Sequence, residues 1–148
     1  MGRLLDFGFL AKRDPKFFLF KHLELFQRFV FFLEIELDDA SFVTIRRSVD
    51  EATKVSVKKH EAGHQDLSTL PMAEWDHQDL PFERARELLD GILDWRALKP
   101  WSYRKALGYL LRSQEDFREV FQLRKFASKH ADWKPFLAHL LGFDAKLV

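Results

Sequence analysis

Aromatic bulk is the feature that most constrains this chain. Sixteen Phe and four Trp occur among 148 residues, and each buried ring removes roughly 150–250 Å² from water. Such a chain can build a packed core without covalent cross-links, and its length predicts a single domain over residues 1–148. Cysteine is absent, which excludes disulfides, thiolate metal sites and a cysteine nucleophile. With no recognisable signal peptide, these features predict an intracellular, cytoplasmic location.

The apolar stretch of residues 17–37 is the candidate for a membrane span. It contains five charged side chains (Lys21, Glu24, Arg28, Glu34 and Glu36), and so many charges at mid-bilayer depth exclude a span. Asp14-Pro15 is typical of a helix start, and the apolar residues after it recur at steps of three and four: Leu19, Leu23, Phe26, Val30, Leu33 and Leu37. This spacing predicts a helix, although the alternation over residues 34–37 also fits a strand.

Residues 38–59 fit two alternatives. Val43 and Ile45 alternate with polar neighbours, and so do Val55 and Val57, which favours a short antiparallel pair of strands. A helical spacing competes with it, through Phe42, Ile45, Val49 and Ala52. The polar residues 60–80, with Gly63 and Pro71, predict a loop that could also separate two subdomains.

Helical patterns occupy the remainder of the chain. Pro81 and Pro100 each precede an apolar stripe, Ser113 and Asp116 form a capping-box pattern, and Asp132 precedes a short stripe that Gly142 closes. The fold class expected from these patterns is mainly α. We expect a compact bundle of about five helices, with room for a small antiparallel β element around residues 35–59.

One motif points to chemistry. Residues 60–64 read His-Glu-Ala-Gly-His, a match to H-E-x-x-H, which on a helix places two His one turn apart around a zinc ion. Over these five residues the chain resembles the zincin metallopeptidases. The resemblance implies His60 and His64 as metal ligands and Glu61 as general base. A third ligand is needed downstream: Glu83 or Glu87 has a suitable order and spacing, with Glu83 taken as the candidate, and Asp76 and His77 are the alternatives.

The net charge of +1 hides an asymmetry. Residues 1–59 have 11 basic and 9 acidic side chains, residues 60–98 have 3 and 9, and residues 99–148 have 10 and 5. The basic C-terminal part leaves nucleic acid open as a partner. The candidate contacts are Arg104, Lys105, Arg112, Arg118, Arg124, Lys125 and Lys129. Arg124 and His130 also have the spacing found in helical ribonucleases of the HEPN type, without that family's usual neighbours.

The leading hypothesis is a non-catalytic interaction or regulatory protein, such as an inhibitor, an immunity-type protein or a small subunit of a larger assembly. So many Phe rings are hard to bury in 148 residues, and an exposed aromatic patch usually marks a partner surface. We expect another protein as the partner and no cofactor. The alternative is a zinc-dependent, metallopeptidase-like hydrolase built on the His60–His64 motif.

Overall fold

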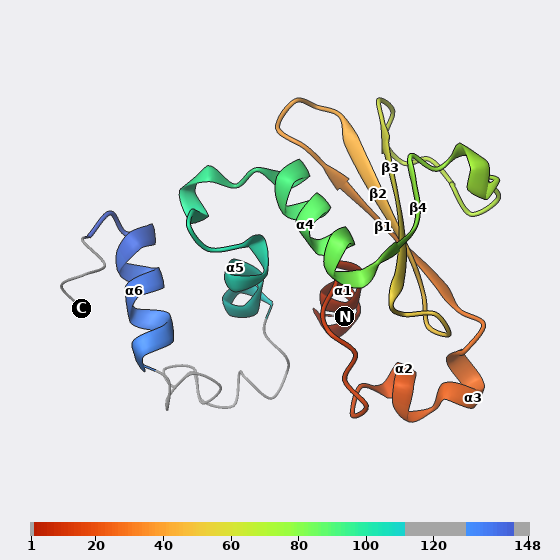
Figure 1. The fold of residues 1–148 in the computed structure, drawn as a ribbon, viewed down its shortest axis with the longest axis horizontal. Helices are drawn as coiled ribbons and strands as arrows, with labels where there is room; N and C mark the ends of the chain where they lie inside the picture. The colour runs from red at the N-terminus through yellow and green to blue at the C-terminus, as the bar shows by residue number, and fades with distance from the viewer. Residues whose placement is uncertain (1, 112–129, 144–148) are drawn as a thin grey trace. The chain divides into compact units, whose positions relative to one another are not determined.

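The computed structural model describes residues 2–111 and 130–143. The chain divides into two compact units, Arg3–Leu93 and Asp94–Val148. The first unit contains a sheet and four helices (Figure 1). The described residues of the second contain the short 3₁₀ turn η2 (Arg96–Leu98) and two helices, α5 (Tyr103–Leu110) and α6 (His130–Leu140). Whether the units form the single domain expected from the chain length stays a prediction.

Four antiparallel strands form the centre of the first unit, in the order β1-β2-β3-β4. They are β1 (Val30–Glu36), β2 (Phe42–Ser48), β3 (Lys54–His60) and β4 (His77–Pro81). Leu33 faces Ile45, and Ile45 faces Val57, so β-branched and apolar side chains meet across the three long strands. Such cross-strand pairs are the main source of sheet stability.

The predicted fold class is wrong: the protein is α+β, because a four-stranded sheet and not a helical bundle organises the first unit. The two inner strands occupy the region where an accessory β element was considered. The error lies mainly in residues 17–37, where one helix was predicted. The structure has two short helices, α2 (Phe18–Lys21) and α3 (Leu23–Phe26), followed by β1. Both faces of β1 have apolar side chains, so its alternation is hidden and helical spacing fits equally well.

Two layers cover the two faces of the sheet. Phe31, Ile45, Arg47 and Val57 share the face that α1 (Gly2–Gly8) and α4 (Phe82–Leu93) cover, which we call the helix-covered face. The other side is the loop-covered face, because residues 61–76 lie over it, including the 3₁₀ turn η1 (Met72–Glu74). In Figure 1 this yellow-green loop lies on the side of the sheet away from α4.

The second unit has a small core of its own. Leu98, Ala106 and Phe136 are buried together, and Trp101 and Tyr109 pack against them. Helix α5 begins three residues after Pro100, and α6 begins before Asp132, which is therefore not its cap. The helix predicted from Ser113 lies outside the described residues.

No helix in the described parts of the chain is both long enough and apolar enough to cross a membrane.

Candidate functional site

Three of the five exposed large apolar side chains of the first unit lie on α2, α3 and the residues that lead into β1; the other two are Leu5 and Phe32. Phe18 is 40% exposed, Leu25 66% and Phe29 50%. The rings are adjacent: the Phe18 and Phe26 centroids are 5.3 Å apart, and those of Phe26 and Phe29 are 5.4 Å apart. We call Phe18, Leu25, Phe26 and Phe29 the apolar strip. Grouped exposed apolar side chains mark interaction sites more often than single surface residues do.

The local sequence explains why the strip faces outward. The Asp14 carboxylate accepts a hydrogen bond from the Lys16 backbone N–H (2.9 Å) and pairs with Arg3 at 2.5 Å. Residues after Asp14 therefore form a turn, and the helix predicted at Pro15 begins only at Phe18. The chain leaves helical geometry again at His22, with φ −120° and ψ 54°. Because of these two breaks, two short helices form in place of one long amphipathic helix. Some of their apolar side chains lie in the core and the others lie at the surface.

A packed aromatic base supports the strip. Phe7, Phe17, Leu19 and Phe20 are buried in one cluster. The Phe7 ring meets Phe17, Phe20 and Phe31 at centroid distances of 6.3, 5.9 and 5.7 Å, within the usual range for edge-to-face and tilted pairs. Phe18 packs on Phe17 and Phe29 on Phe31, which lowers the conformational entropy that these two rings lose when a partner binds.

The strip lies within a positively charged stretch of the sequence. Five cationic side chains between residues 12 and 28 are exposed: Lys12, Arg13, Lys16, Lys21 and Arg28. The stretch also has two acidic residues. Asp14 pairs with Arg3, and the Glu24 carboxylate lies 3.9 Å from the His22 ring nitrogen Nδ1. An apolar centre with a basic surround suits a partner surface that is apolar and acidic.

The structure places the His-Glu-Ala-Gly-His motif at the end of a strand. His60 is the last residue of β3, and residues 61–64 turn away from it as a loop, with His64 at φ 58°. The His60 Nδ1–H donates to the Ala62 carbonyl (2.7 Å), and its Nε2 lies 2.8 Å from the Thr44 hydroxyl. The His60 side chain is only 6% exposed, so this residue belongs to the packing of the loop-covered face.

Other residues of the motif have structural contacts as well. The His64 backbone N–H donates to the Glu34 carboxylate (2.8 Å). A Cβ at Gly63 would lie 2.7 Å from the Phe42 ring, so the loop needs glycine there to approach β2. Glu61 is exposed. The motif therefore lies where β3 ends and the following loop begins, and its residues do not form the helix that the zinc hypothesis requires.

Glu83, the expected third ligand, lies on the first turn of α4 and so over the opposite face of the sheet from His60. It pairs with Lys12 at 3.7 Å and with Arg86 at 3.3 Å. Within the described residues, no group of three or more His, Asp or Glu side chains is arranged to hold a metal ion. The zinc hydrolase stays a prediction from the sequence, and the fold does not bring its proposed ligands together.

Two of the seven candidate nucleic-acid residues are described. Arg104 and Lys105 are half-buried on α5, and the Lys105 Nζ lies 5.9 Å from the centroid of the Tyr109 ring. The other five lie outside the described residues: Arg112, Arg118, Arg124, Lys125 and Lys129. The nucleic-acid hypothesis stays a prediction.

Sequence reasoning missed Arg47. This residue of β2 is 1% exposed, and its guanidinium donates to three backbone carbonyls: Ala52 (2.9 Å), Phe7 (2.7 Å) and Ala11 (2.9 Å). Its Cζ also lies 4.1 Å from the Phe7 ring centroid and 4.9 Å from that of Phe82. The sequence did contain a sign that Arg47 is buried. Arg47 follows Val43 and Ile45 at steps of two, so strand alternation places its side chain on the same face, toward the core.

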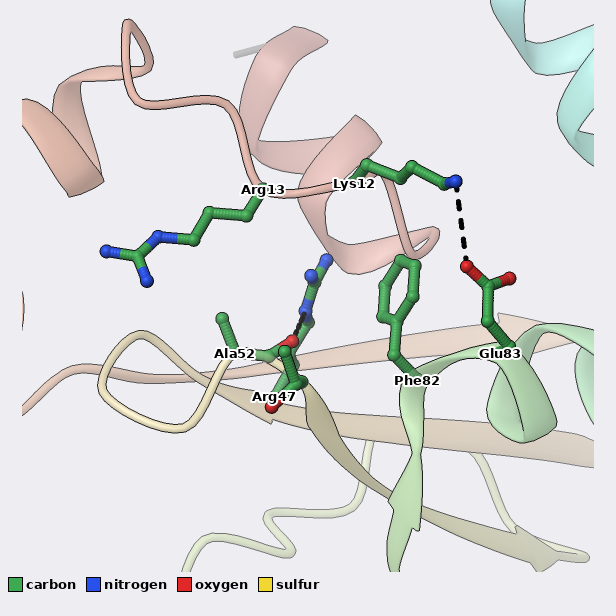
Figure 2. A pocket seen from close by; sticks show the side chains of 7 residues that line it. Lys12, Arg13, Arg47, Ala52, Phe82 and Glu83 are labelled. Carbon is green, nitrogen blue, oxygen red and sulfur yellow. Dashed lines mark hydrogen bonds and ion pairs between the residues drawn. The ribbon is translucent and has the colours of Figure 1, made fainter.

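A cavity of about 220 Å³ lies beside Arg47. Figure 2 shows that the Lys12 and Arg13 side chains extend in opposite directions, while Arg47 stands between Ala52 and Phe82. Lys12 reaches toward Glu83, and Arg13 lies over the Phe20 ring at 5.0 Å. Because these cations do not converge on one point, the observed contacts give Arg47 a structural role: it ties β2 to the end of α1 and to the β2–β3 turn.

Comparison with known proteins gives no relative: no protein-family model, curated protein or solved structure matches this chain.

Proposed function

We propose that this protein is a non-catalytic interaction protein, and that the apolar strip of α2 and α3 binds a partner protein. The observation that carries the proposal is the exposure of Phe18, Leu25 and Phe29 on consecutive segments of the chain, with Phe18 packed on the buried Phe17 ring. Interface centres are enriched in aromatic and aliphatic anchors of this kind, and a few of them supply most of the binding free energy.

The partner surface is expected to be acidic around an apolar centre. Lys16, Lys21 and Arg28 are exposed and lie within three residues of a member of the strip in the sequence, and opposite charges at an interface rim mainly accelerate association. Rim contacts of this type weaken with added salt, since the Debye length falls from about 10 Å at 0.1 M to about 3 Å at 1 M. The apolar centre would be less affected by salt.

The test is site-specific photo-cross-linking in the source cells. A benzophenone side chain at Leu25 is expected to give a discrete protein adduct, because a bound partner would cover this position. The same probe at Glu51, an exposed residue of the β2–β3 turn, is the control and should give no adduct of that mass. The adduct identifies the partner, which is then purified for titration.

Leu25→Glu should then weaken binding of the purified partner by about tenfold to a hundredfold, since burying a leucine contributes roughly 1.5–3 kcal/mol. Equal affinity of the wild type and Leu25→Glu would contradict the proposal. So would cross-linking at Leu25 to lipid only, which would instead make this surface a membrane-binding one.

A further inference from the structure

The outer edge of β1 presents backbone groups that the described residues leave unpaired. The Val49 N–H bonds the Phe29 carbonyl and the Leu37 N–H bonds the Ser41 carbonyl, so the odd-numbered residues of β1 face β2 in hydrogen-bonded pairs. The even-numbered residues direct their N–H and C=O groups away from β2: Val30, Phe32, Glu34 and Glu36. None of these four backbones makes a hydrogen bond to another residue in the described ranges.

The two edges of the sheet differ in protection. β4 is five residues long, ends at Pro81, has Asp79 at φ 46° and is paired to β3 through an irregular register, and short strands, prolines and bulges all discourage further pairing. β1 has seven residues and regular register, and it contains neither proline nor lysine. Its two charged side chains, Glu34 and Glu36, both lie on the loop-covered face, and β1 has no proline, lysine or bulge that would prevent the addition of one more strand.

We propose that β1 pairs with β1 of a second copy of this chain, antiparallel about a two-fold axis at Leu33, to give a continuous eight-stranded sheet. In this register Leu33 faces Leu33 of the second copy, and Phe31 faces Ile35. The outward groups of Val30 meet those of Glu36, and those of Phe32 meet those of Glu34. The interface is isologous, as two-fold symmetry requires, and does not depend on the partner proposed for the apolar strip.

Charge and strand length favour this register over its neighbours. A shift toward the C-terminus places Glu34 opposite Glu34 of the second copy, and like charges directly opposite destabilise a strand pair. A shift toward the N-terminus pairs Glu36 with Arg28, which lies before β1 begins, and so leaves part of the strand facing irregular backbone. Only the register centred on Leu33 pairs the whole strand, with apolar contacts on the helix-covered face.

The absence of cysteine makes the register directly testable. In a Leu33→Cys variant the two thiols would lie across a non-hydrogen-bonded pair with Cα atoms about 4.5 Å apart, which suits a disulfide. Oxidised glutathione is therefore expected to convert this variant to a covalent dimer on a non-reducing gel. Ile35→Cys is the matched control. In the proposed register the Cα atoms of the two introduced thiol residues would lie on the order of 13 Å apart, too far for a disulfide.

A second pair of variants tests the backbone edge without a thiol. Phe32→Pro removes an outward N–H and keeps the β1–β2 hydrogen bonds, whereas Phe32→Ala removes the same ring and keeps that N–H. Two hydrogen bonds are lost per dimer, so the dissociation constant of Phe32→Pro should exceed that of Phe32→Ala about tenfold or more in sedimentation equilibrium. Circular dichroism confirms that both variants are folded.

Three results would overturn the inference: a monomeric wild type throughout the micromolar to millimolar range, equal cross-linking of Leu33→Cys and Ile35→Cys, or equal dissociation constants for the folded Phe32 variants. Leu25→Glu should leave self-association unchanged, because Leu25 lies outside β1. Loss of dimerisation in that variant would instead assign the dimer contact to the apolar strip. Failure of either proposal can thus be recognised independently of the other.

Discussion

The two faces of the sheet are covered in different ways. The helix-covered face is apolar, and its one buried charge, Arg47, is held by three carbonyls and two aromatic rings. The loop-covered face is mixed, and its cover depends on single contacts such as His60 with the Ala62 carbonyl, His64 with Glu34 and Gly63 against Phe42. On the first face Arg47 is the point where a charge is buried, whereas the second face depends on separate polar and close contacts between the loop and the strands.

The largest expected effect is at the buried charge. Arg47→Met should lower the free energy of unfolding by about 3 kcal/mol, because three buried carbonyls would lose their charged donor. The neighbouring Arg46 projects to the loop-covered face and is half-buried, so Arg46→Met should change stability by less than about 0.5 kcal/mol. Urea unfolding of both variants measures these changes. Equal losses of unfolding free energy would contradict the difference between the two faces at this pair of arginines.

An intermediate effect is expected where the loop approaches β2. Gly63→Ala would place a Cβ 2.7 Å from the Phe42 ring, and overpacking of this kind costs roughly 1–2 kcal/mol. Gly91 on α4 has nothing within 4 Å of its would-be Cβ, so Gly91→Ala should stabilise the unit by roughly 0.5–1 kcal/mol. Thermal unfolding should therefore show opposite signs for the same substitution. A Phe42→Leu background should reduce the Gly63→Ala penalty, and an unchanged penalty would contradict the contact.

The smallest effect concerns the exposed β1–β2 turn. Hydrogen bonds from the Ser41 hydroxyl and the Ser41 backbone N–H, with a further one from Lys59, lower the pKa of Asp39 from 3.8 to about 2. A lowered pKa stabilises the folded state above about pH 4, and this contribution is lost as the pH falls through about 2. NMR titration of the Asp39 carboxyl carbon measures the pKa. Ser41→Ala should raise it more than Lys59→Met does; the reverse order would contradict the assigned causes.

Sequence patterns predicted the elements that bury one face and expose the other. Val43, Ile45, Val55 and Val57 are buried on the inner strands, where their alternation favoured a strand pair. The stripe after Pro81 forms α4, with Ala85 and Leu89 fully buried. Only the end of β1 was considered as strand, because Phe32 packs on Trp75 on one face while Leu33 meets Gly8 on the other. With both faces occupied, the period of two disappears from the sequence.

The candidate site was only partly predictable. A surplus of Phe predicted exposed rings, but burial of Phe17 and exposure of Phe18 depend on where the helix breaks at Asp14 and His22. The motif at residues 60–64 suggested a metal site on a helix, where two His four residues apart lie on the same face. The structure has the end of a strand and a loop there, so the same spacing does not bring the side chains together in that way. Strand β4 has no strand signal of its own; its pairing with β3 defines it.

The amino-acid sequence by itself determined that cysteine chemistry is excluded, that a large aromatic core can form, and that the inner strands and α4 each have a buried side, because these follow from residue type and periodicity. Tertiary structure decided which strands form the edges of the sheet, which Phe rings reach the surface, and that Arg47 and His60 are held inside. These outcomes depend on contacts between residues far apart in the chain, and no local pattern specifies the free energy of such contacts.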